Sequence, residues 1–494
     1  MLNIKEGFIV CDADTKKNII LESKGFNNYI FLSYSDLINK MLGTVTKDAE
    51  LVLVERYGFS YDQALEILGY LPFIENIHYN NPKLDSLVTI KNYLKSMDLY
   101  KENNLFKSRL SSYPVTFIYP EYNKITKLLI NQIENYTEVF CIDNDSKAYN
   151  HKVSCFQTRT QECLYVMNTI TNLLKNGVDI NKIILTNIDS SYEFVLKRMS
   201  KTYGIPIRFS KKSNILSTDF ATKLLFELSN SNTIEELLLK LDKESPYFNK
   251  IIDIINNYKI QNRCPKDMYD FFKAKLKSMN YDCLEYKNAV RVSNSLKFKD
   301  DEHVFFLGFN LGNAPKAFKD DKYLSDSELD IIGLDTSYDR NVNARNNLIQ
   351  FINHTKNLYL SYKNSDSKDD YEPSTLIKDK NLEVVNPIID VGYSKLEDDL
   401  RIATAYDALI KYKTKSQMLD YDINHLKYNS FDNKYKAISK EILDERFNEK
   451  KLKLSYSSMK TYLACPFSYF ADRILYLNEF IPNMAARLGS YSHG

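Results

Sequence analysis

Apolar runs and helical patterns alternate over the first 145 residues of the chain. Short runs rich in Ile, Val and Phe predict strands at residues 8–11, 18–21, 29–32, 115–119 and 138–142. Between the third and fourth runs, about residues 47–108 carry a helical pattern, strongest at 61–71 and 84–99. Strands interleaved with helices in this way predict a mostly parallel sheet with a helical insertion.

A second α/β pattern begins near residue 150 and is the clearest in the chain. Strands are predicted at 153–156, 183–185 and 204–207, with a helix at 192–199 before the last of them. The helix between the first two strands has one apolar face, formed by Cys163, Val166, Met167, Ile170, Leu173 and Leu174. Asn176 and Gly177 then give a signal that ends the helix.

Helices alone are predicted from 214 to 286, at 220–228, 234–241, 248–260 and 268–279. Strands resume at 289–292, 304–309 and 358–362, and a polar loop is predicted at 364–373. A helical connector is expected from about 395 to 445. We therefore predict an α/β fold in four parts. The first two, 1–145 and 150–375, each carry a helical insertion, at about 47–108 and at about 214–286. A helical connector at 376–452 and a C-terminal part at 453–494 follow.

Composition adds little about partners but limits the compartment. The net charge is +2, so no overall basic field indicates nucleic acid. Seven scattered cysteines without paired spacing predict free, mostly buried thiols rather than a disulfide framework. The N-terminus lacks a basic segment followed by an apolar run, and no stretch approaches 18 uninterrupted apolar residues. We expect a cytoplasmic chain with no membrane partner.

No nucleotide-binding loop occurs in the sequence. A phosphate-binding loop needs glycines for close backbone approach and a lysine for the β- and γ-phosphates. Neither GxxxxGK[ST] nor GxGxxG is present, and no acidic pair that could hold Mg²⁺ ends a strand in the first part. We expect no ATP binding or hydrolysis by this chain.

Four segments in order nevertheless resemble the second RecA-like domain of UvrD-type superfamily 1 helicases. The first is the helix that carries Glu162, with the following NGVD at 176–179 and IIL at 183–185. The second is YGIP at 203–206. The third is HVFFLGFNLGNAP at 303–315, and the fourth is FINHTKNLYLSY at 351–362. The third segment is similar to that family's VFLLGxNEGxxP strand and loop. The resemblance implies two RecA-like domains. The alternative is another α/β domain with a chance GxxP loop.

One departure from the helicase pattern bears on catalysis. Where active helicases have Thr-Arg-Ala before the last strand, this chain has Thr355, Lys356 and Asn357. Lysine lacks the planar fork with which an arginine finger stabilises γ-phosphate charge. The missing finger and the missing phosphate loop agree, and both indicate an inactivated helicase scaffold.

The C-terminal part carries the sharpest signal. Residues 455–470, SYSSMKTYLACPFSYF, predict two helices, with Ser455 as N-cap of the first and Pro466 in the first turn of the second. An apolar face would follow through Phe467, Phe470, Ala471 and Ile474. Downstream, GSYSH ends on His493.

These two segments are similar to the opening of RecB-family PD-(D/E)XK nuclease domains, SxSxLxxYxxCPxxYF followed by GxxxH. With the degenerate helicase before it, the chain resembles AddB-type subunits of AddAB helicase–nucleases. The resemblance implies that Cys465 is one of four ligands of a [4Fe–4S] cluster. It also implies that His493 helps to bind the Mg²⁺ of the nuclease. The alternatives are a small buried cysteine at 465 and an ordinary surface histidine at 493.

The same resemblance sets expectations for function. The catalytic Asp, Asp/Glu and Lys of such nucleases follow the histidine, so this chain would be C-terminally truncated and catalytically incomplete. The implied partners are DNA and an AddA-like motor subunit, in a complex that processes double-strand breaks for recombination. The rival hypothesis is a non-catalytic, helicase-derived scaffold that binds DNA or a partner. A third option, an active helicase subunit, conflicts with the missing phosphate loop.

Two remaining features invite functional readings that we do not favour. His303 follows three acidic residues, which suggests a metal site, but its place before an apolar strand favours a turn. The charged stretch at 432–453 is typical of a solvated helix.

Overall fold

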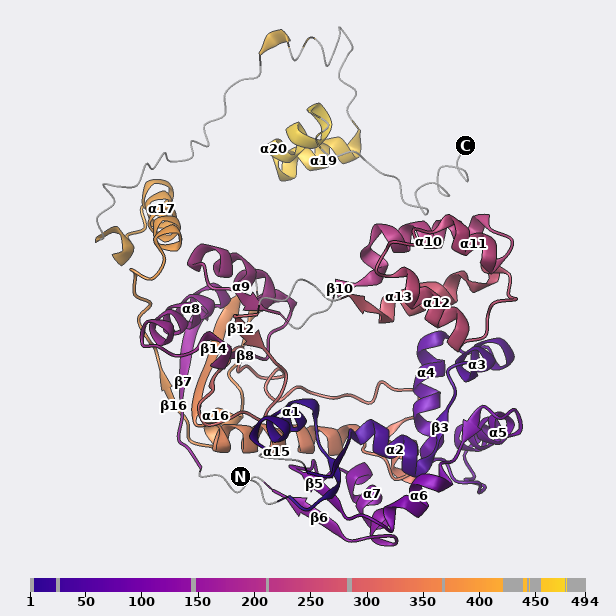
Figure 1. The fold of residues 1–494 in the computed structure, drawn as a ribbon. Helices are drawn as coiled ribbons and strands as arrows, with labels where there is room; N and C mark the ends of the chain where they lie inside the picture. The colour runs from indigo at the N-terminus through magenta and orange to yellow at the C-terminus, as the bar shows by residue number, and fades with distance from the viewer. Residues whose placement is uncertain are drawn as a thin grey trace. The chain divides into compact units, whose positions relative to one another are not determined.

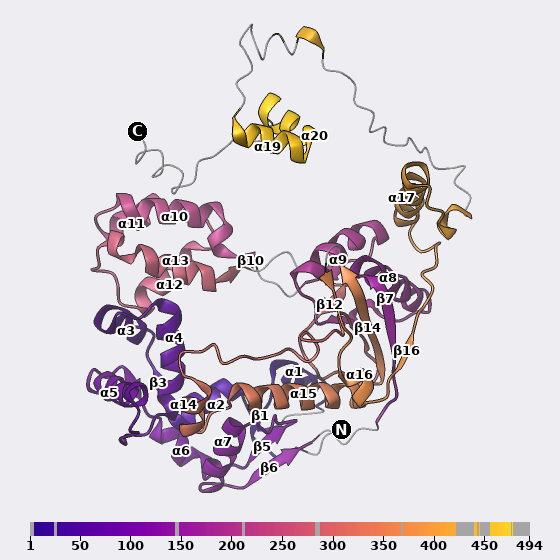
Figure 2. The ribbon, with the colours of Figure 1, turned by 180° about the vertical axis from the view of Figure 1, so that it is seen from behind.

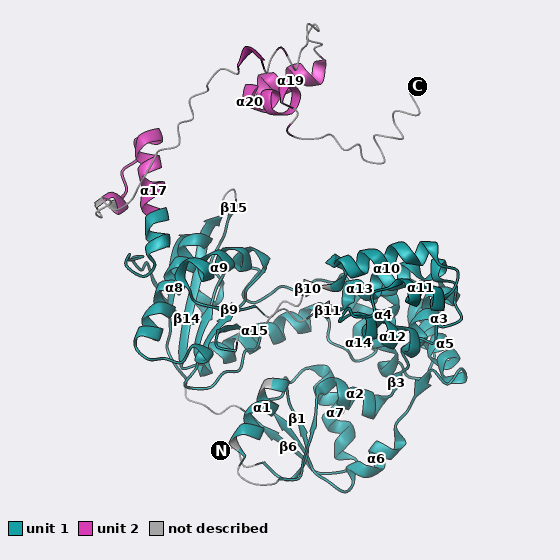
Figure 3. Cartoon of the chain, turned by 45° about the horizontal axis from the view of Figure 1, so that its top comes forward, with its two compact units in different colours: residues 1–400 teal, residues 401–494 magenta. Residues whose placement is uncertain are grey.

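The computed structural model describes residues 4–23, 27–143, 148–209, 213–281, 287–366, 369–420, 439–441, 444, 455–475 and 477. The chain divides into two compact units, residues 1–400 and 401–494 (Figure 3). The first unit confirms a mixed α/β fold with mostly parallel sheets. Within the described residues, no helix has the length and apolar character needed to cross a bilayer.

The first sheet has four parallel strands in the order β2 (Tyr29–Leu32), β1 (Gly7–Val10), β5 (Val115–Ile118) and β6 (Val139–Ile142). Its core lies on both faces, because alternate strand residues point to opposite sides. The helices α2 (Tyr34–Leu42), α6 (Asn104–Leu110) and α7 (Lys124–Glu134) cover one face. Helix α1 (Ala13–Glu22) lies on the other face (Figure 1). Its Ile19 belongs to the core on that face.

The strand predicted at 18–21 is wrong, because these residues lie in α1. Asp12, six residues before this run, caps the helix, and an N-cap signal favours a helix over a strand. Ile19 is buried, whereas Ile20 and Leu21 are 54% and 69% exposed. An apolar run with one buried residue in three fits a helix on the sheet surface better than a central strand.

The predicted first insertion consists of α3 (Ala49–Tyr57), α4 (Tyr61–Tyr70), the 3-10 turn η1 (Leu71–Phe73) and α5 (Pro82–Ser96). A two-residue antiparallel pair, β3 (Thr44–Val45) and β4 (Tyr100–Lys101), closes its base. Residues far along the chain complete its core: Leu324, Leu329, Ile332 and Leu334, on and around α14 (Asp326–Ile331), pack into it. The same segment is held by polar contacts, since Tyr323 N–H donates to Glu66 at 3.0 Å.

The second sheet is larger. Its strands follow the order β16 (Glu383–Val385), β7 (Lys152–Thr158), β14 (Asn357–Asp366), β13 (His303–Phe306), β8 (Ile183–Thr186), β12 (Val290–Val292) and β9 (Ile207–Arg208), all parallel. The helices α8 (Arg159–Lys175) and α9 (Ser190–Tyr203) cover one face, and α15 (Ser337–His354) and α16 (Leu376–Asp379) cover the other (Figure 2).

The loop predicted at 364–373 is wrong in its first part. β14 continues to Asp366 and pairs in antiparallel fashion with β15 (Asp369–Asp370). Backbone pairing across this hairpin outweighs its polar composition, because the pairing satisfies backbone N–H and C=O groups whatever the side chains are.

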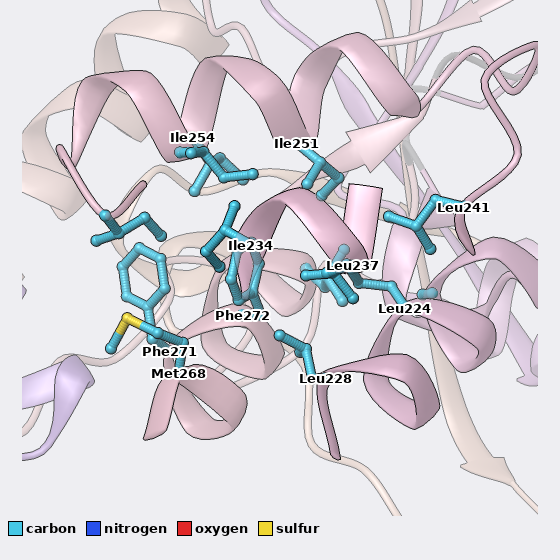
Figure 4. Close-up of a cluster of buried hydrophobic side chains, with 14 of the residues drawn as sticks. Leu224, Leu228, Ile234, Leu237, Leu241, Ile251, Ile254, Met268, Phe271 and Phe272 are labelled. Atoms are coloured by element: carbon cyan, nitrogen blue, oxygen red, sulfur yellow. The ribbon is translucent and has the colours of Figure 1, made fainter. Parts of the chain in front are cut away.

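The second insertion contains four helices: α10 (Asp219–Asn230), α11 (Ile234–Lys240), α12 (Phe248–Asn257) and α13 (Tyr269–Ser278). The antiparallel pair β10 (Ser213–Asn214) and β11 (Asn280–Tyr281) lies at its base. Two short 3-10 turns, η3 (Ile215–Ser217) and η4 (Pro265–Met268), complete it. Figure 4 shows its core, in which Leu224, Ile251 and Phe272 meet from three helices. Leu51 of α3 joins this core, and the buried Glu50 and Lys275 form an ion pair. The two insertions therefore pack together.

In the C-terminal part, α17 (Lys395–Tyr412) crosses the boundary between the units, and η5 (Gln417–Asp420) follows it. Two helices are present after Ser455, as predicted: α19 (Tyr456–Ala464) and α20 (Pro466–Tyr469). Ser455 caps α19 by accepting a hydrogen bond from Ser458 N–H at 3.1 Å. A π-helical turn (Phe470–Ile474) continues from α20, and Phe467 is 70% exposed. Most of the charged stretch at 432–453 lies outside the described residues.

Candidate functional site

The carboxyl ends of parallel strands are where α/β sheets usually bind ligands, because the loops there surround a crevice. Each sheet of this chain has polar side chains gathered at that edge. We call them the Asp12 edge, on the first sheet, and the Glu162 edge, on the second.

At the Asp12 edge, strand β1 passes into helix α1 without a loop that could surround a phosphate. Asp12 occupies the junction, and its carboxylate accepts hydrogen bonds from Thr15 N–H at 2.7 Å and from Thr15 Oγ1 at 2.9 Å. A helix N-terminus attracts anions through its unpaired N–H groups and its dipole. Here the protein's own carboxylate takes that position.

A lysine from the second α/β region lies at the same edge. Lys297 Nζ is 3.6 Å from Asp12 Oδ2 and donates to the carbonyl oxygen of Tyr119 at 2.7 Å. Tyr119 directly follows β5 and has a positive φ of 50°. Burial raises the pKa of Asp12, but the hydrogen bonds from Thr15 and the charge of Lys297 outweigh it and lower that pKa. Asp12 is therefore a stable anion, and the lysine is its counter-ion.

Cys11, beside Asp12, does not act as a nucleophile in this environment. Burial, with a further contribution from the negative charge of Asp12, raises the pKa of its thiol to about 11. A thiol rather than a thiolate is present at neutral pH, and the thiol is a weak nucleophile.

At the Glu162 edge, a fully buried carboxylate accepts three hydrogen bonds. Tyr192 Oη donates to Glu162 Oε2 at 2.6 Å, while Ser361 Oγ and the Gly308 N–H donate to Oε1 at 2.6 and 2.9 Å. The donors come from α9, from β14 and from the loop after β13. Burial raises the pKa of Glu162 in spite of these donors and the nearby charge of Lys363.

Two cations flank this carboxylate. Lys363, which is 4% exposed, lies 3.2 Å from Asp366 and 4.3 Å from the centre of the Tyr371 ring. Arg159 also pairs with Asp366, while its Nε is buried without a hydrogen-bond partner among the described residues. Burial, together with the charge of Arg159, lowers the pKa of Lys363.

The Glu162 edge holds the loop at 307–315 in one conformation. Gly308 has φ +65°, and a Cβ there would lie 3.0 Å from Asn313 Nδ2 and 3.1 Å from the Tyr192 ring. Asn187 Nδ2 donates to the Leu307 carbonyl oxygen at 2.8 Å, and Asn310 Nδ2 donates to that of Lys363 at 2.8 Å. Since solvent does not reach Glu162, these groups position the loop and do not form a reactive centre. Leu311, 53% exposed, is the part that the loop presents outward.

The predicted finger position lies away from this edge. Thr355 is buried, Lys356 is exposed, and Asn357 begins β14 at its amino end. Ser361, which donates to Glu162, lies five residues beyond Lys356, roughly 16 Å along an extended strand, so the structure does not bring Lys356 and Glu162 together.

The two predicted cofactor ligands have different outcomes. Cys465 is exposed and caps α20, its sulfur accepting a hydrogen bond from Ser468 N–H at 3.4 Å. A small buried cysteine, the alternative at this position, is therefore not what the structure has. His493 lies outside the described residues. Within the described part of the chain, no group of three or more His, Cys, Asp or Glu side chains could hold a metal ion.

The structure also tests the predictions for His303 and for the cysteines. His303 is the first residue of β13 rather than a turn residue, and its Nδ1 lies 3.1 Å from Tyr359 Oη. All six described cysteines are free, but only Cys11 and Cys163 are buried, so the expectation of mostly buried thiols is wrong.

Asp12, Lys297, Arg159 and Lys363 were not identified from the sequence. An aspartate three residues before a threonine, directly after a strand, is a cap signal that could have identified Asp12. The lysines and the arginine carry no such signal, because their roles depend on contacts with distant segments.

No family model matches this chain, and no match is found among curated proteins.

Proposed function

We propose that this chain is a non-motor subunit of a helicase–nuclease of the AddAB type, which processes DNA ends for recombinational repair. It would guide DNA through a helicase-derived scaffold while a partner subunit hydrolyses ATP. The nuclease assignment rests on the resemblance of residues 455–493 to RecB-family domains.

The arrangement of elements supports this proposal. Two parallel sheets follow one another in the chain, and each is interrupted by a helical insertion, as in a pair of RecA-like domains. The segments that resemble the helicase motifs are α8, β13 with its loop, and the junction of α15 with β14. All three belong to one sheet, and the Glu162 network joins α8 to the loop after β13 and to Ser361 of β14.

The observation that carries the proposal is the junction of β1 with α1. In a motor domain this junction is an open loop that binds phosphate. Here the Asp12 carboxylate caps the helix and Lys297 pairs with it. A nucleotide phosphate would face a fixed negative charge at the position where it needs N–H donors, which fits a subunit that leaves ATP to its partner.

The first experiment measures ATP turnover by the purified 494-residue chain, alone and with an AddA-type motor subunit. We expect no DNA-stimulated hydrolysis by the chain alone, and hydrolysis in the mixture that stops when the phosphate-loop lysine of the motor subunit is replaced. Hydrolysis by the chain alone that persists through repurification would contradict the proposal.

The second experiment distinguishes a subunit that guides DNA from a scaffold that binds only a protein partner. Fluorescence anisotropy with a single-stranded oligonucleotide should show binding that weakens as salt rises, because phosphate contacts release counter-ions. Binding to the motor subunit without any binding to DNA would instead support a partner-binding scaffold.

A further inference from the structure

A pocket of about 310 Å³ lies in the first region, beside helix α5. Its walls combine apolar side chains with amide and amine groups: Leu42, Pro72, Phe73, Ile74, Glu75, Asn76, Val88, Lys91, Asn92, Lys95, Leu128 and Gln132. It is separate from both sheet edges described above. A volume near 300 Å³ is at the lower end for ligand sites and suits a small molecule.

Lys91 has an unusual position for a lysine in this pocket. Its Nζ donates to the Ile74 carbonyl oxygen at 2.6 Å and lies 4.9 Å from the centre of the Tyr100 ring. Among the described residues, no carboxylate forms an ion pair with it. Lys95, one turn further along α5, pairs with Glu102 at 2.8 Å. Lys95 is thus paired with a carboxylate, whereas Lys91 has no such ion pair among the described residues.

The surroundings favour the neutral amine of Lys91. Burial, followed by the charge of Lys95, lowers its pKa to about 8, although Glu102 and Glu75 act in the opposite direction. At pH 8 about half of such a group is uncharged, compared with roughly one in 250 for a lysine of ordinary pKa. The uncharged form has the lone pair that a nucleophile needs.

We propose that Lys91 is a covalent binding site for a small aldehyde, which the pocket holds as an imine. The Nζ lone pair adds to the carbonyl carbon, the carbonyl oxygen takes up a proton, and the resulting carbinolamine loses water to form the C=N bond. No oxidant or reductant is required, so the linkage is reversible. The apolar side chains Leu42, Phe73 and Val88 on the pocket wall can contact the hydrocarbon part of the aldehyde. This site does not depend on the function proposed above.

Reductive trapping tests the proposal on the full chain. Benzaldehyde is added at pH 7.5 with cyanoborohydride, which donates hydride to the C=N bond and makes the linkage permanent. Peptide mass spectrometry then gives the labelling rate of each lysine. We expect Lys91 to react at least about 10-fold faster than the median lysine, with a rate that levels off above pH 8. A rate at or below the median, or one that rises through pH 9 as for exposed lysines, would overturn the proposal.

Variants and a second aldehyde test separately what the Lys91 amine and the pocket contribute to the labelling rate. Lys91→Arg should lose the fast label while circular dichroism stays unchanged. Lys95→Gln removes the neighbouring positive charge and should slow labelling of Lys91 a few-fold at pH 7.5, with the pocket lining otherwise kept. An aldehyde-bearing dextran, whose volume far exceeds 310 Å³, should label Lys91 no faster than the median lysine. Equal preference for the dextran and the small aldehyde would show that the pocket plays no part.

Discussion

The two sheet edges place charged groups at the same position of the same architecture but at very different depths. At the Glu162 edge the carboxylate is fully buried and three donors from three segments converge on it. At the Asp12 edge the carboxylate and Lys297 are each about 40% exposed and joined by one ion pair. Burial magnifies the cost of an unpaired polar group, whereas exposed pairs contribute little. The Glu162 network therefore fixes the loop at 307–315, whereas the Asp12–Lys297 pair only occupies the position where a ligand would bind.

The largest effect should come from Glu162→Ala. It leaves the Tyr192 and Ser361 hydroxyls and the Gly308 N–H without an acceptor in a solvent-free site, and it creates a cavity. We expect a loss of about 3–5 kcal/mol in the free energy of unfolding. Urea unfolding followed by circular dichroism measures it. Glu235→Ala, on an exposed helical turn, is the control and should cost less than about 0.5 kcal/mol.

The pH dependence of the same site sharpens this prediction. Because the folded-state pKa of Glu162 is raised, its protonated form contributes stability below the usual glutamate pKa, and that contribution is lost as pH rises through the folded pKa. Wild type should therefore gain stability relative to Glu162→Gln as pH falls from neutral towards the usual glutamate pKa. An unchanged difference over this range would mean that Glu162 does not titrate there.

Gly308→Ala should have the next largest effect. Its φ of +65° disfavours a side chain, and the new Cβ would lie at 3.0–3.1 Å from Asn313 and Tyr192. We expect a loss of about 2–3 kcal/mol by thermal or urea unfolding. Gly312→Ala is a matched control, since its φ is +78° but nothing lies within 4 Å, so it should cost only about 1 kcal/mol. Equal losses would mean that the contacts at Gly308 contribute nothing.

Asp12→Ala tests the exposed edge, where we expect about 1 kcal/mol from the lost cap. Asp12→Asn keeps a capping oxygen without the charge and should cost less. Since the folded-state pKa of Asp12 is lowered, its contribution is present above the usual aspartate pKa and is lost as pH falls through the folded pKa. The difference between wild type and Asp12→Asn should therefore shrink in acid, as measured by urea midpoints at pH 7 and pH 3.

The smallest effect should come from Lys297→Ala, which removes one half-exposed ion pair and one hydrogen bond to Tyr119. We expect about 0.5–1 kcal/mol, decreasing with added salt. Lys322→Ala, at an exposed position, is the control. A loss above about 2 kcal/mol would remove the contrast between the two edges.

Local patterns predicted most of the strands and helices, because alternation and helical spacing are read within a dozen residues. The pattern that put Cys163 and Met167 on one face of α8 is an example, and both are buried there. The misassigned run at 18–21 shows the limit, since three apolar residues in a row fit either a strand or an exposed helix until the cap at Asp12 is considered. The extension of β14 depended on a hairpin partner that composition did not indicate.

The candidate site was much less accessible from the sequence. Glu162 was noted as part of a helicase-like helix, but its burial depends on Tyr192, Ser361 and Gly308, which lie 30 to 199 residues away. Lys297 and Lys363 are two of 66 basic residues, and nothing local distinguishes them. Contacts between distant segments set the properties of these side chains.

The packing of α14 into the core of the first insertion has a consequence for how the protein is made. Glu66 and its partner Tyr323 are 257 residues apart, so the ribosome must add that many residues before the N-terminal core can close. At roughly 5–20 residues per second, this takes about 13 to 50 seconds. During that time the apolar side chains of α4 and α5 that share a core with Leu324 and Leu329 lack these partners, so the N-terminal core stays incomplete until late in synthesis.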